Sequence, residues 1–585
     1  MVGYSVIFLL LAMLMNPQSP EWLTRAELSG FQETSRYAET LDYCRRLQAA
    51  SPWIRFTSFG KSPEGRDLPL LIVSKHGAFT SGEAHRSDAA IVLIINGIHS
   101  GEIAGKEASL MLLRDITVAK QKPDLPARVV LLVVPIFNVD GHERMSAYNR
   151  VNQNGPREMG WRGTAQNLNL NRDWIKADQP EMRAMLKLYN EWLPDLVIDN
   201  HVSDGADFQY DITWLLDDNP RVGAPLLQYI QKDLEPYLLT TLNTSGHTAS
   251  RYFELRDSTD PAAGIDLGPT TARFSNGYGT LRNRPAFVVE THMLKSFETR
   301  IKAHYDFMEA VLKKLSGDPQ PLRSAVSESD ELTATIPSKY PIRLKQNTEK
   351  SEPFVFRGVE YTRQRSAVSG TTSISYGTKP VEITIPFYRT MDPEITIDPP
   401  LGYIIPPQWT FVTDRLDLHG IAYSRLSAPV TGEFETYRFS EVTWDAEPFE
   451  GHHLAHFKSA KVTERRTLPV GSAVVWLNQK TNKVILEMLE PDAKDSLIAW
   501  GYFDPIFEQK EYAEGYVLEK LAAEMLQKDP KLKEEFELRL KNDPQFASDP
   551  SARLLFFYRR SPYQDPYKNA YPVVRITDRS QVQPH

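Results

Sequence analysis

Cysteine is almost absent from this sequence of 585 residues, which excludes a fold held together by disulfides. Its one cysteine, Cys44, has no intrachain partner, and the chain is compatible with either redox compartment. An excess of basic residues is absent too, because 67 lysines and arginines stand against 75 aspartates and glutamates and the formal net charge is −8. Since no basic run interrupts this balance, we expect no nucleic-acid partner.

A run of apolar residues that comfortably spans a membrane is also missing. The apolar stretch before Asn16 and Pro17 has the length of a signal-peptide core, although no lysine or arginine precedes it and no clear cleavage site follows it. We therefore predict that residues 1–20 are a signal peptide or an anchor, with a buried helix as the alternative. We expect no membrane span in the mature chain and a secreted or periplasmic location. The oligomeric state is left open.

What is present is the composition of a globular protein, with 41% hydrophobic and 24% charged residues. A chain of this length exceeds one ordinary core, so several domains are expected. Strand patterns alternate with helical patterns and cover residues 68–73, 90–96, 128–137, 194–201 and 285–292. This alternation predicts an α/β domain over residues 30–315, with a mixed, largely parallel sheet flanked by helices.

The rest of the chain differs in composition. Residues 316–345 are rich in serine, acidic residues and proline, which predicts a linker. Residues 346–475 are rich in β-branched and aromatic residues and predict a β-rich domain. Residues 476–585 have mainly helical spacing and predict a helical tail.

Two potential metal ligands lie where one predicted strand passes into a helix. His99 and Glu102 are three positions apart, so both can point at one ion from a tight turn. The best third ligand is His201, at the end of another buried strand, with a strand-capping hydrogen bond as the alternative. Two imidazoles and one carboxylate leave a fourth zinc position for water, as in catalytic zinc sites.

These residues belong to an ordered series of motifs that resembles the zinc carboxypeptidases of the carboxypeptidase A type, as in a multidomain bacterial member. The resemblance covers roughly residues 37–316, about half of the chain. It rests on the segments 60–66, 96–102, 135–141, 161–164, 168–174, 199–201 and 285–291. It implies a carboxypeptidase-like fold and one zinc ion held by His99, Glu102 and His201.

The same resemblance implies roles for residues beyond the metal. Glu290 would be the general base, and Arg162 would stabilise the oxyanion; zinc chemistry needs both a proton acceptor and a positive charge at these places. Asn171 and Arg172 would hold the terminal carboxylate, to which an arginine fork donates two parallel hydrogen bonds. Tyr278, flanked by glycines, would be the family's mobile, substrate-binding tyrosine.

Alternatives to these assignments stay open. Arg162 and Arg172 could be surface arginines, with Arg150 or Arg157 as the true partner instead. The pair Asn149–Arg150 competes with Asn171–Arg172 as the carboxylate anchor, and Glu254 competes with Glu290 as the general base. We prefer Glu290 because it lies on the better buried strand, where an unpaired carboxylate is costly unless it serves a site.

The sequence also departs from the family pattern. Asn169 stands where an aspartate usually orients the first zinc histidine; its amide oxygen can still accept the imidazole proton, but it raises the basicity of the ligand less. Gly101 stands where digestive members often have arginine. The floor of the specificity pocket is expected within residues 257–275, and its candidate determinants are Asp257, Asp260, Asp266 and Arg273.

We therefore expect a zinc metallopeptidase, a hydrolase that cleaves the C-terminal peptide bond of peptides or proteins with a free C-terminus through a metal-activated water. One alternative is an amidase or peptidase that acts on peptidoglycan stem peptides with the same zinc chemistry. The other is a catalytically silent binding protein.

Overall fold

The computed structural model describes residues 20–582. Its largest element is an eight-stranded mixed sheet whose four central strands run parallel. In spatial order the strands are β1 (Ile54–Lys61), β2 (Asp67–Val73), β4 (Val129–Val134), β3 (Ala90–Asn96), β5 (Leu196–Ser203), β10 (Ala286–His292), β6 (Ile212–Leu215) and β7 (Ala249–Arg251). The prediction of a mixed, largely parallel sheet is confirmed.

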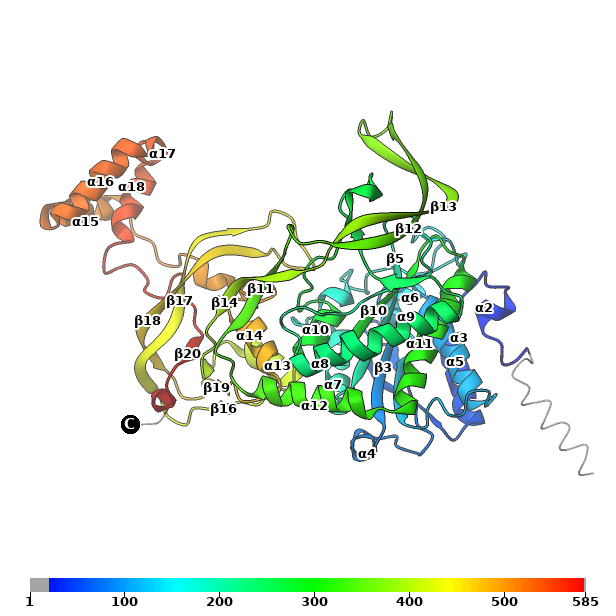
Figure 1. The fold of residues 1–585 in the computed structure, drawn as a ribbon. Helices are drawn as coiled ribbons and strands as arrows, with labels where there is room; N and C mark the ends of the chain where they lie inside the picture. The colour runs from blue at the N-terminus through cyan, green and yellow to red at the C-terminus, as the bar shows by residue number, and fades with distance from the viewer. Residues whose placement is uncertain (1–19, 583–585) are drawn as a thin grey trace, which may run out of the picture.

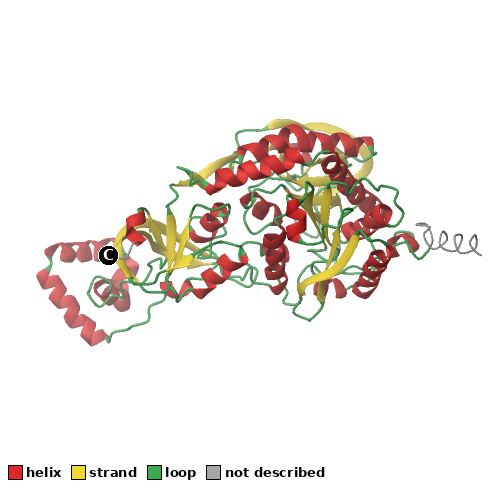
Figure 2. Ribbon diagram, turned by 90° about the horizontal axis from the view of Figure 1, so that it is seen from below, coloured by secondary structure: helices red, strands yellow, loops and turns green. Residues whose placement is uncertain are grey.

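Helices cover both faces of this sheet, as Figures 1 and 2 show. Side chains of β3 alternate between two cores: Ile91 and Leu93 pack in one of them, and Val92 and Ile94 in the other. A strand that is buried on both faces has a continuous run of apolar residues, and this run allowed β3 to be predicted as a strand from the sequence. The helices of this part are α2 (Arg25–Leu28), α3 (Tyr37–Ala50), α4 (Ser81–Arg86), α5 (Ala104–Thr117), α6 (Val139–Glu143), α7 (Pro180–Trp192), α8 (Ala224–Tyr229), α9 (Glu235–Thr244), α10 (Ser275–Leu281), α11 (Phe297–Gly317) and α12 (Gln320–Ala334).

A second, wholly antiparallel sheet of six strands lies in the C-terminal half (Figure 1). Its strands in spatial order are β16 (Ser424–Arg425), β19 (Ala473–Trp476), β15 (Gly402–Ile405), β20 (Val574–Ile576), β17 (Val430–Trp444) and β18 (Ala455–Leu468). Around it lie α13 (Thr410–Leu418) and α14 (Asn482–Leu489), and a terminal helical cluster is made of α15 (Gly515–Lys528), α16 (Pro530–Asn542), α17 (Pro544–Ser548) and α18 (Pro550–Tyr558). The helical tail is therefore present, but β20 returns from it to an inner position of the sheet.

A long hairpin connects the two halves. It consists of β12 (Glu352–Arg365) and β13 (Thr372–Tyr388), and β13 pairs with the short β9 (Ile265–Asp266), which itself pairs with β8 (Glu254–Leu255). A two-stranded sheet of β11 (Tyr340–Gln346) and β14 (Met391–Ile397) flanks the hairpin. Strands from the predicted β-rich domain thus extend a sheet of the α/β part.

The segment predicted to be a linker, residues 316–345, is not one. It contains α12, whose Leu322, Ala325 and Val326 pack into the same core as α5 and α11. Asp330 of this helix pairs with the buried Arg284 at 2.9 Å. Of the polar residues that suggested a linker, Ser324, Ser327 and Glu328 lie on the solvent side of this amphipathic helix, whereas Ser329 and Asp330 are buried.

The predicted leader lies almost wholly outside the described residues. Within residues 20–582, no helix combines the length and the apolar character needed to cross a membrane.

Close packing of α5 against the sheet offers a test of the fold beside the predicted metal site. A Cβ added at Gly105 would lie 2.4 Å from Cβ of Asn200, the neighbour of His201. We predict that Gly105→Ala lowers the free energy of unfolding by about 1–3 kcal/mol, as overpacking does, although alanine is the better helix former. Chemical denaturation followed by circular dichroism measures it.

Gly82 in α4 is the matched control, because the nearest atom to its added Cβ is the end of the Arg86 side chain at 3.9 Å. Gly82→Ala is expected to leave stability unchanged or raise it by up to ~1 kcal/mol. Equal effects of the two substitutions would contradict the packing described for α5.

Candidate metal centre and active site

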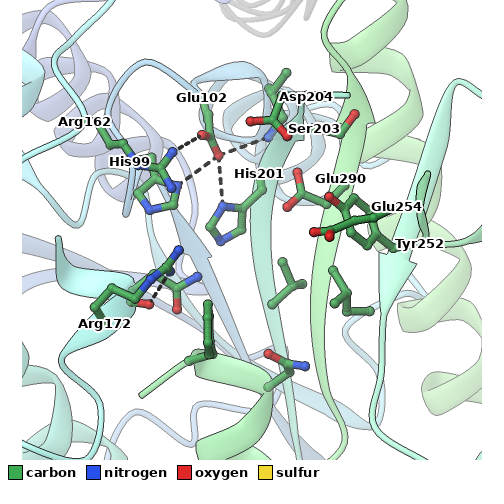
Figure 3. A pocket seen from close by; sticks show the side chains of 16 residues that line it. His99, Glu102, Arg162, Arg172, His201, Ser203, Asp204, Tyr252, Glu254 and Glu290 are labelled. Atoms are coloured by element: carbon green, nitrogen blue, oxygen red, sulfur yellow. Dashed lines mark hydrogen bonds and ion pairs between the residues drawn. The ribbon is translucent and has the colours of Figure 1, made fainter. Parts of the chain in front are cut away.

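A pocket of about 300 Å³ opens at the carboxyl ends of the central strands, where sites collect in parallel sheets (Figure 3). Its walls carry seven residues to which the sequence assigned a role: His99, Glu102, Arg162, Asn171, Arg172, His201 and Glu290. They also carry Glu254, the alternative general base. The other residues of the lining had no assigned role: Val202, Ser203, Asp204, Leu215, Tyr252, Phe274, Asn276 and Val288.

The backbone of three segments brings the potential ligands together. After β3 the chain turns at Gly97, where φ is +64°, and the backbone N–H of Glu102 donates to the carbonyl of His99 at 2.9 Å before α5 begins. His201 lies within β5, next to Glu290 in the parallel register with β10, so both side chains project to the same face.

Glu102 is the centre of the cluster. Its Oε2 lies 3.2 Å from Nδ1 of His99 and 2.9 Å from Nδ1 of His201, and all three side chains are buried. Its Oε1 accepts hydrogen bonds from Arg150 at 2.8 Å and from Arg162 at 3.1 Å. These partners hold the pKa of Glu102 well below its usual value despite burial, so the carboxylate is charged.

In its neutral form, His99 directs a nitrogen lone pair at an oxygen lone pair of Glu102. Oδ1 of Asn169 accepts from the backbone N–H of Asn171 at 2.9 Å, which fixes it as an acceptor, and it lies 3.0 Å from Nε2 of His99. Burial lowers the pKa of His99 to about 4, so the ring is neutral and its one proton is donated to Asn169. Nδ1 of His99 therefore presents a lone pair to the Glu102 carboxylate, an arrangement that a cation would stabilise.

His201 is oriented by a carboxylate instead of an amide. Its Nε2 lies 3.0 Å from Oδ2 of Asp199, which also accepts a hydrogen bond from Oγ of Ser275 at 2.7 Å. Although burial opposes the charged ring, Asp199 and Glu102 together raise the pKa of His201 well above its usual value. Without a metal, His201 is charged at neutral pH and donates its Nδ1 proton to Glu102.

This donor set fits zinc. The ligand atoms of His99, Glu102 and His201 all lie within 4.8 Å of one another. Ligand atoms around a tetrahedral zinc, bonded at about 2.0–2.2 Å, are roughly 3.3–3.6 Å apart. The distances of 3.2 and 2.9 Å from Oε2 of Glu102 to the two imidazole nitrogens are close to this value. Two imidazoles and one carboxylate are a known catalytic ligand set, and one tetrahedral position stays open towards the pocket.

Glu290 faces this centre from β10. Its Oε2 accepts no hydrogen bond from the described part of the chain. Burial raises its pKa to about 8, and the neighbouring Glu102 adds to this, while His201 opposes it. A bound divalent cation would stabilise the carboxylate and lower this pKa.

Positive charge gathers on the opposite side of the pocket (Figure 3). The guanidinium of Arg172 lies 4.2 Å from the ring centre of Phe274 and donates to the carbonyl of Asn171 at 2.8 Å. Burial, followed by the charge of Arg162, lowers the pKa of Arg172 to about 10. Oδ1 of Asn171 accepts from the backbone N–H of Ser275 at 3.0 Å, so its amide N–H groups remain for a ligand.

Two alternatives from the sequence can now be compared. Arg150 is engaged with Glu102 at 2.8 Å and does not line the pocket, so it is a partner of the cluster rather than an anchor. Glu254 does line the pocket, but from β8 and with an exposed side chain, whereas Glu290 is adjacent to His201.

The prediction for Tyr278 is wrong. Its ring is fully buried against Trp174 and Tyr189, and its hydroxyl is hydrogen-bonded to Nδ1 of His419 at 2.9 Å. The glycines beside it serve close packing and not motion, because a Cβ at Gly279 would lie 2.4 Å from Cβ of Ala286. Tyr252 lines the pocket instead, with no sequence signal beyond its place after β7.

The four candidate determinants of the pocket floor are wrong, although Phe274 of the expected range 257–275 does line the pocket. None of the four lines the pocket, and Arg273 instead donates to Asp495 of the C-terminal half at 2.6 Å. Phe274 and Asn276, directly beyond Arg273, lie on the wall with Leu215 and Val288.

Comparison with known proteins agrees with this geometry. Residues 40–191 match the family model described as zinc carboxypeptidase. Carboxypeptidase 2 of Trichophyton rubrum is 25% identical over 496 residues, which cover 83% of this chain and 87% of that protein. Probable carboxypeptidase 2 of Arthroderma benhamiae is 24% identical over 494 residues, which cover 82% of this chain and 88% of that protein.

Among solved structures, carboxypeptidase A from Helicoverpa armigera aligns with a TM-score of 0.36 and 17% identity, over 54% of this chain and 78% of that one. The family match thus covers residues 40–191, and the curated carboxypeptidases are similar to this chain over most of its length. The chain is a hydrolase of the metallopeptidase class.

Metal binding should release protons, because His201 is charged in the metal-free site and must lose its Nδ1 proton to become a ligand. We predict that zinc binding at pH 7 gives calorimetric heats that differ between buffers in proportion to their ionisation enthalpies, with the sign of proton release. Identical heats in all buffers would contradict the protonation states assigned here.

Asp199 should strengthen zinc binding through its contact with His201. We predict that Asp199→Asn weakens zinc binding about 10–100-fold, as the loss of an orienting partner of a metal ligand does, with little change in unfolding. Competition with a chromogenic chelator measures the affinity. Asn169→Asp, at the other imidazole, is the matched variant and is expected to tighten binding; weaker binding in both variants would point to general damage.

Proposed function

We propose that this protein is a zinc-dependent metallocarboxypeptidase that removes the C-terminal residue of peptides or proteins. The observation that carries the proposal is the arrangement of one pocket. A three-ligand metal cluster and Glu290 lie on one side, and the guanidinium of Arg172 lies on the other without an acidic partner in the described residues. An endopeptidase has no need of a partly buried, unpaired cation in the same pocket as its metal.

Zinc held by His99, Glu102 and His201 would lower the pKa of a bound water to about 7 and polarise a carbonyl oxygen. The chain itself supplies the remaining functions. Glu290, next to His201, takes a proton from the attacking water and delivers it to the amine that leaves. Arg162, which is 43% exposed in its side chain, can turn from Glu102 to the oxyanion.

Arg172 and Asn171 select the substrate end. Burial makes the guanidinium of Arg172 costly without an anion, since its pKa is already lowered to about 10. A terminal carboxylate would compensate this charge through two parallel hydrogen bonds, and the amide of Asn171 would add a third donor. Leu215, Val288 and Phe274 would then surround the side chain that is removed.

A secreted or periplasmic location is part of this proposal and rests on the apolar leader. The same zinc chemistry would serve peptidoglycan stem peptides, which also end in a free carboxylate. A silent binding protein is disfavoured because the ligand set and Glu290 are all present.

The free C-terminus is the feature to test. We predict that amidation of the C-terminus lowers kcat/KM at least about 100-fold, because the partly buried guanidinium of Arg172 then lacks its anion. In Arg172→Ala the two peptides are expected to become nearly equal, through loss of activity on the free acid. Peptide cleavage followed by mass spectrometry measures both.

Glu290→Gln is the control for chemistry, with a fall in kcat of about 10²–10⁴ and an intact preference for binding the free acid. Equal cleavage of free and amidated peptides by the unmodified enzyme would overturn the assignment of Arg172.

A further inference from the structure

A second cavity, of about 340 Å³, adjoins the catalytic pocket. The two share Asp204, Tyr252 and Glu254, so the second cavity lies next to the first along this rim. The other residues of its lining are mostly apolar: Gly205, Ala206, Phe208, Phe253, Leu255, Ser258, Ile374 and Tyr376.

Two distant parts of the chain build this cavity. Phe208 and Phe253 come from the α/β part, whereas Ile374 and Tyr376 come from β13 of the hairpin. Main-chain contacts fix the hairpin here: the backbone N–H of Gln209 donates to the carbonyl of Arg357 at 2.9 Å. The cavity thus exists only because the hairpin lies over the catalytic part.

The floor of the cavity is closely packed, whereas its hairpin wall is partly exposed. Phe208 stacks on His292 with ring centres 4.0 Å apart and contacts Phe253 at 5.5 Å. Both phenylalanines are 6% exposed. Ile374 and Tyr376 are only half-buried, so their apolar surface is available to a ligand.

The position of the cavity relative to Arg172 indicates on which side of the scissile bond it would contact a substrate. In Figure 3, Arg172 lies on one side of the metal cluster, and Asp204, Tyr252 and Glu254 lie on the other. A peptide whose terminal carboxylate is bound by Arg172 would pass the cluster and leave towards this rim. The second cavity therefore lies on the N-terminal side of the scissile bond, beyond the residue that carries the scissile carbonyl.

The charges at the rim restrict which side chains the cavity can accept. Within the described residues, neither Asp204 nor Glu254 forms an ion pair, and the charge of each carboxylate raises the energy of a further negative charge nearby. An acidic side chain would meet two carboxylates on entry. An aliphatic or aromatic side chain would bury apolar area against Phe208, Ile374 and Tyr376.

We propose that the hairpin-covered cavity is an upstream subsite that accepts an apolar side chain of the peptide substrate, beyond the residue carrying the scissile carbonyl. The proposal rests on the carboxypeptidase function proposed above. It makes the enzyme selective for longer peptides with an aliphatic or aromatic residue upstream of the cleavage point.

The test is a set of blocked tetrapeptides with a constant C-terminal pair, in which each upstream position is in turn phenylalanine, alanine or aspartate. At one position we expect kcat/KM to fall at least about tenfold from phenylalanine to alanine, and further for aspartate. An N-formyl dipeptide with the same C-terminal pair has no residue for the cavity and sets the basal activity.

Two substitutions in the hairpin wall, Ile374→Asp and Tyr376→Ala, should each remove most of the preference for phenylalanine and leave the rate on the N-formyl dipeptide unchanged. Val368→Asp, at the hairpin tip where the side chain is 99% exposed, is the matched control and should keep the preference.

A flat upstream profile, or a phenylalanine preference that survives both wall variants, would overturn the subsite while carboxypeptidase activity stands. Failure of the unmodified, zinc-loaded enzyme to cleave any of the peptides, the N-formyl dipeptide included, would overturn the proposed function and the subsite with it.

Discussion

A carboxylate held between two buried imidazoles is the constraint on which the rest of the site depends. Glu102 lies within 3.2 Å of Nδ1 of both His99 and His201. Burial makes His99 neutral, so its lone pair and the Glu102 carboxylate face each other and favour a cation between them. Glu290, Arg162 and Arg172 line the same pocket, so a cation held there would have a proton acceptor and positive charges beside it, as a hydrolytic site requires.

The C-terminal half forms hydrogen bonds with the segments that build this site, so it is not structurally independent of them. Its Glu450 accepts a hydrogen bond from the backbone N–H of Asn169 at 2.7 Å, and Asn169 in turn orients His99. Asp495 accepts from the backbone N–H of Arg273 at 2.9 Å, next to the pocket wall. Apolar residues of both sheets also belong to one continuous core, so the site and the C-terminal sheet are coupled by packing.

The sequence predicted the metal cluster because its ligands follow buried, apolar strands whose ends must meet at one edge of a parallel sheet. It failed at Tyr278, because flanking glycines indicate either motion or close packing, and only the contact of Gly279 with Ala286 decides between them. It failed for residues 316–345 because a polar composition conceals the apolar spacing of α12. The sequence could not predict that Ile374 and Tyr376 line a cavity. The placement of the hairpin depends on contacts between residues far apart in the chain, such as the hydrogen bond from Nε2 of Gln209 to the carbonyl of Gly358, which is 149 positions away.

The claim that His99, Glu102 and His201 hold one zinc ion is tested most directly by X-ray absorption at the zinc edge on the purified protein, combined with elemental analysis. The account predicts close to one zinc per chain and a first shell of two imidazole nitrogens with oxygen ligands, at about 2.0–2.2 Å. A protein that binds no zinc after reconstitution, or a zinc shell without imidazole scattering, would contradict it.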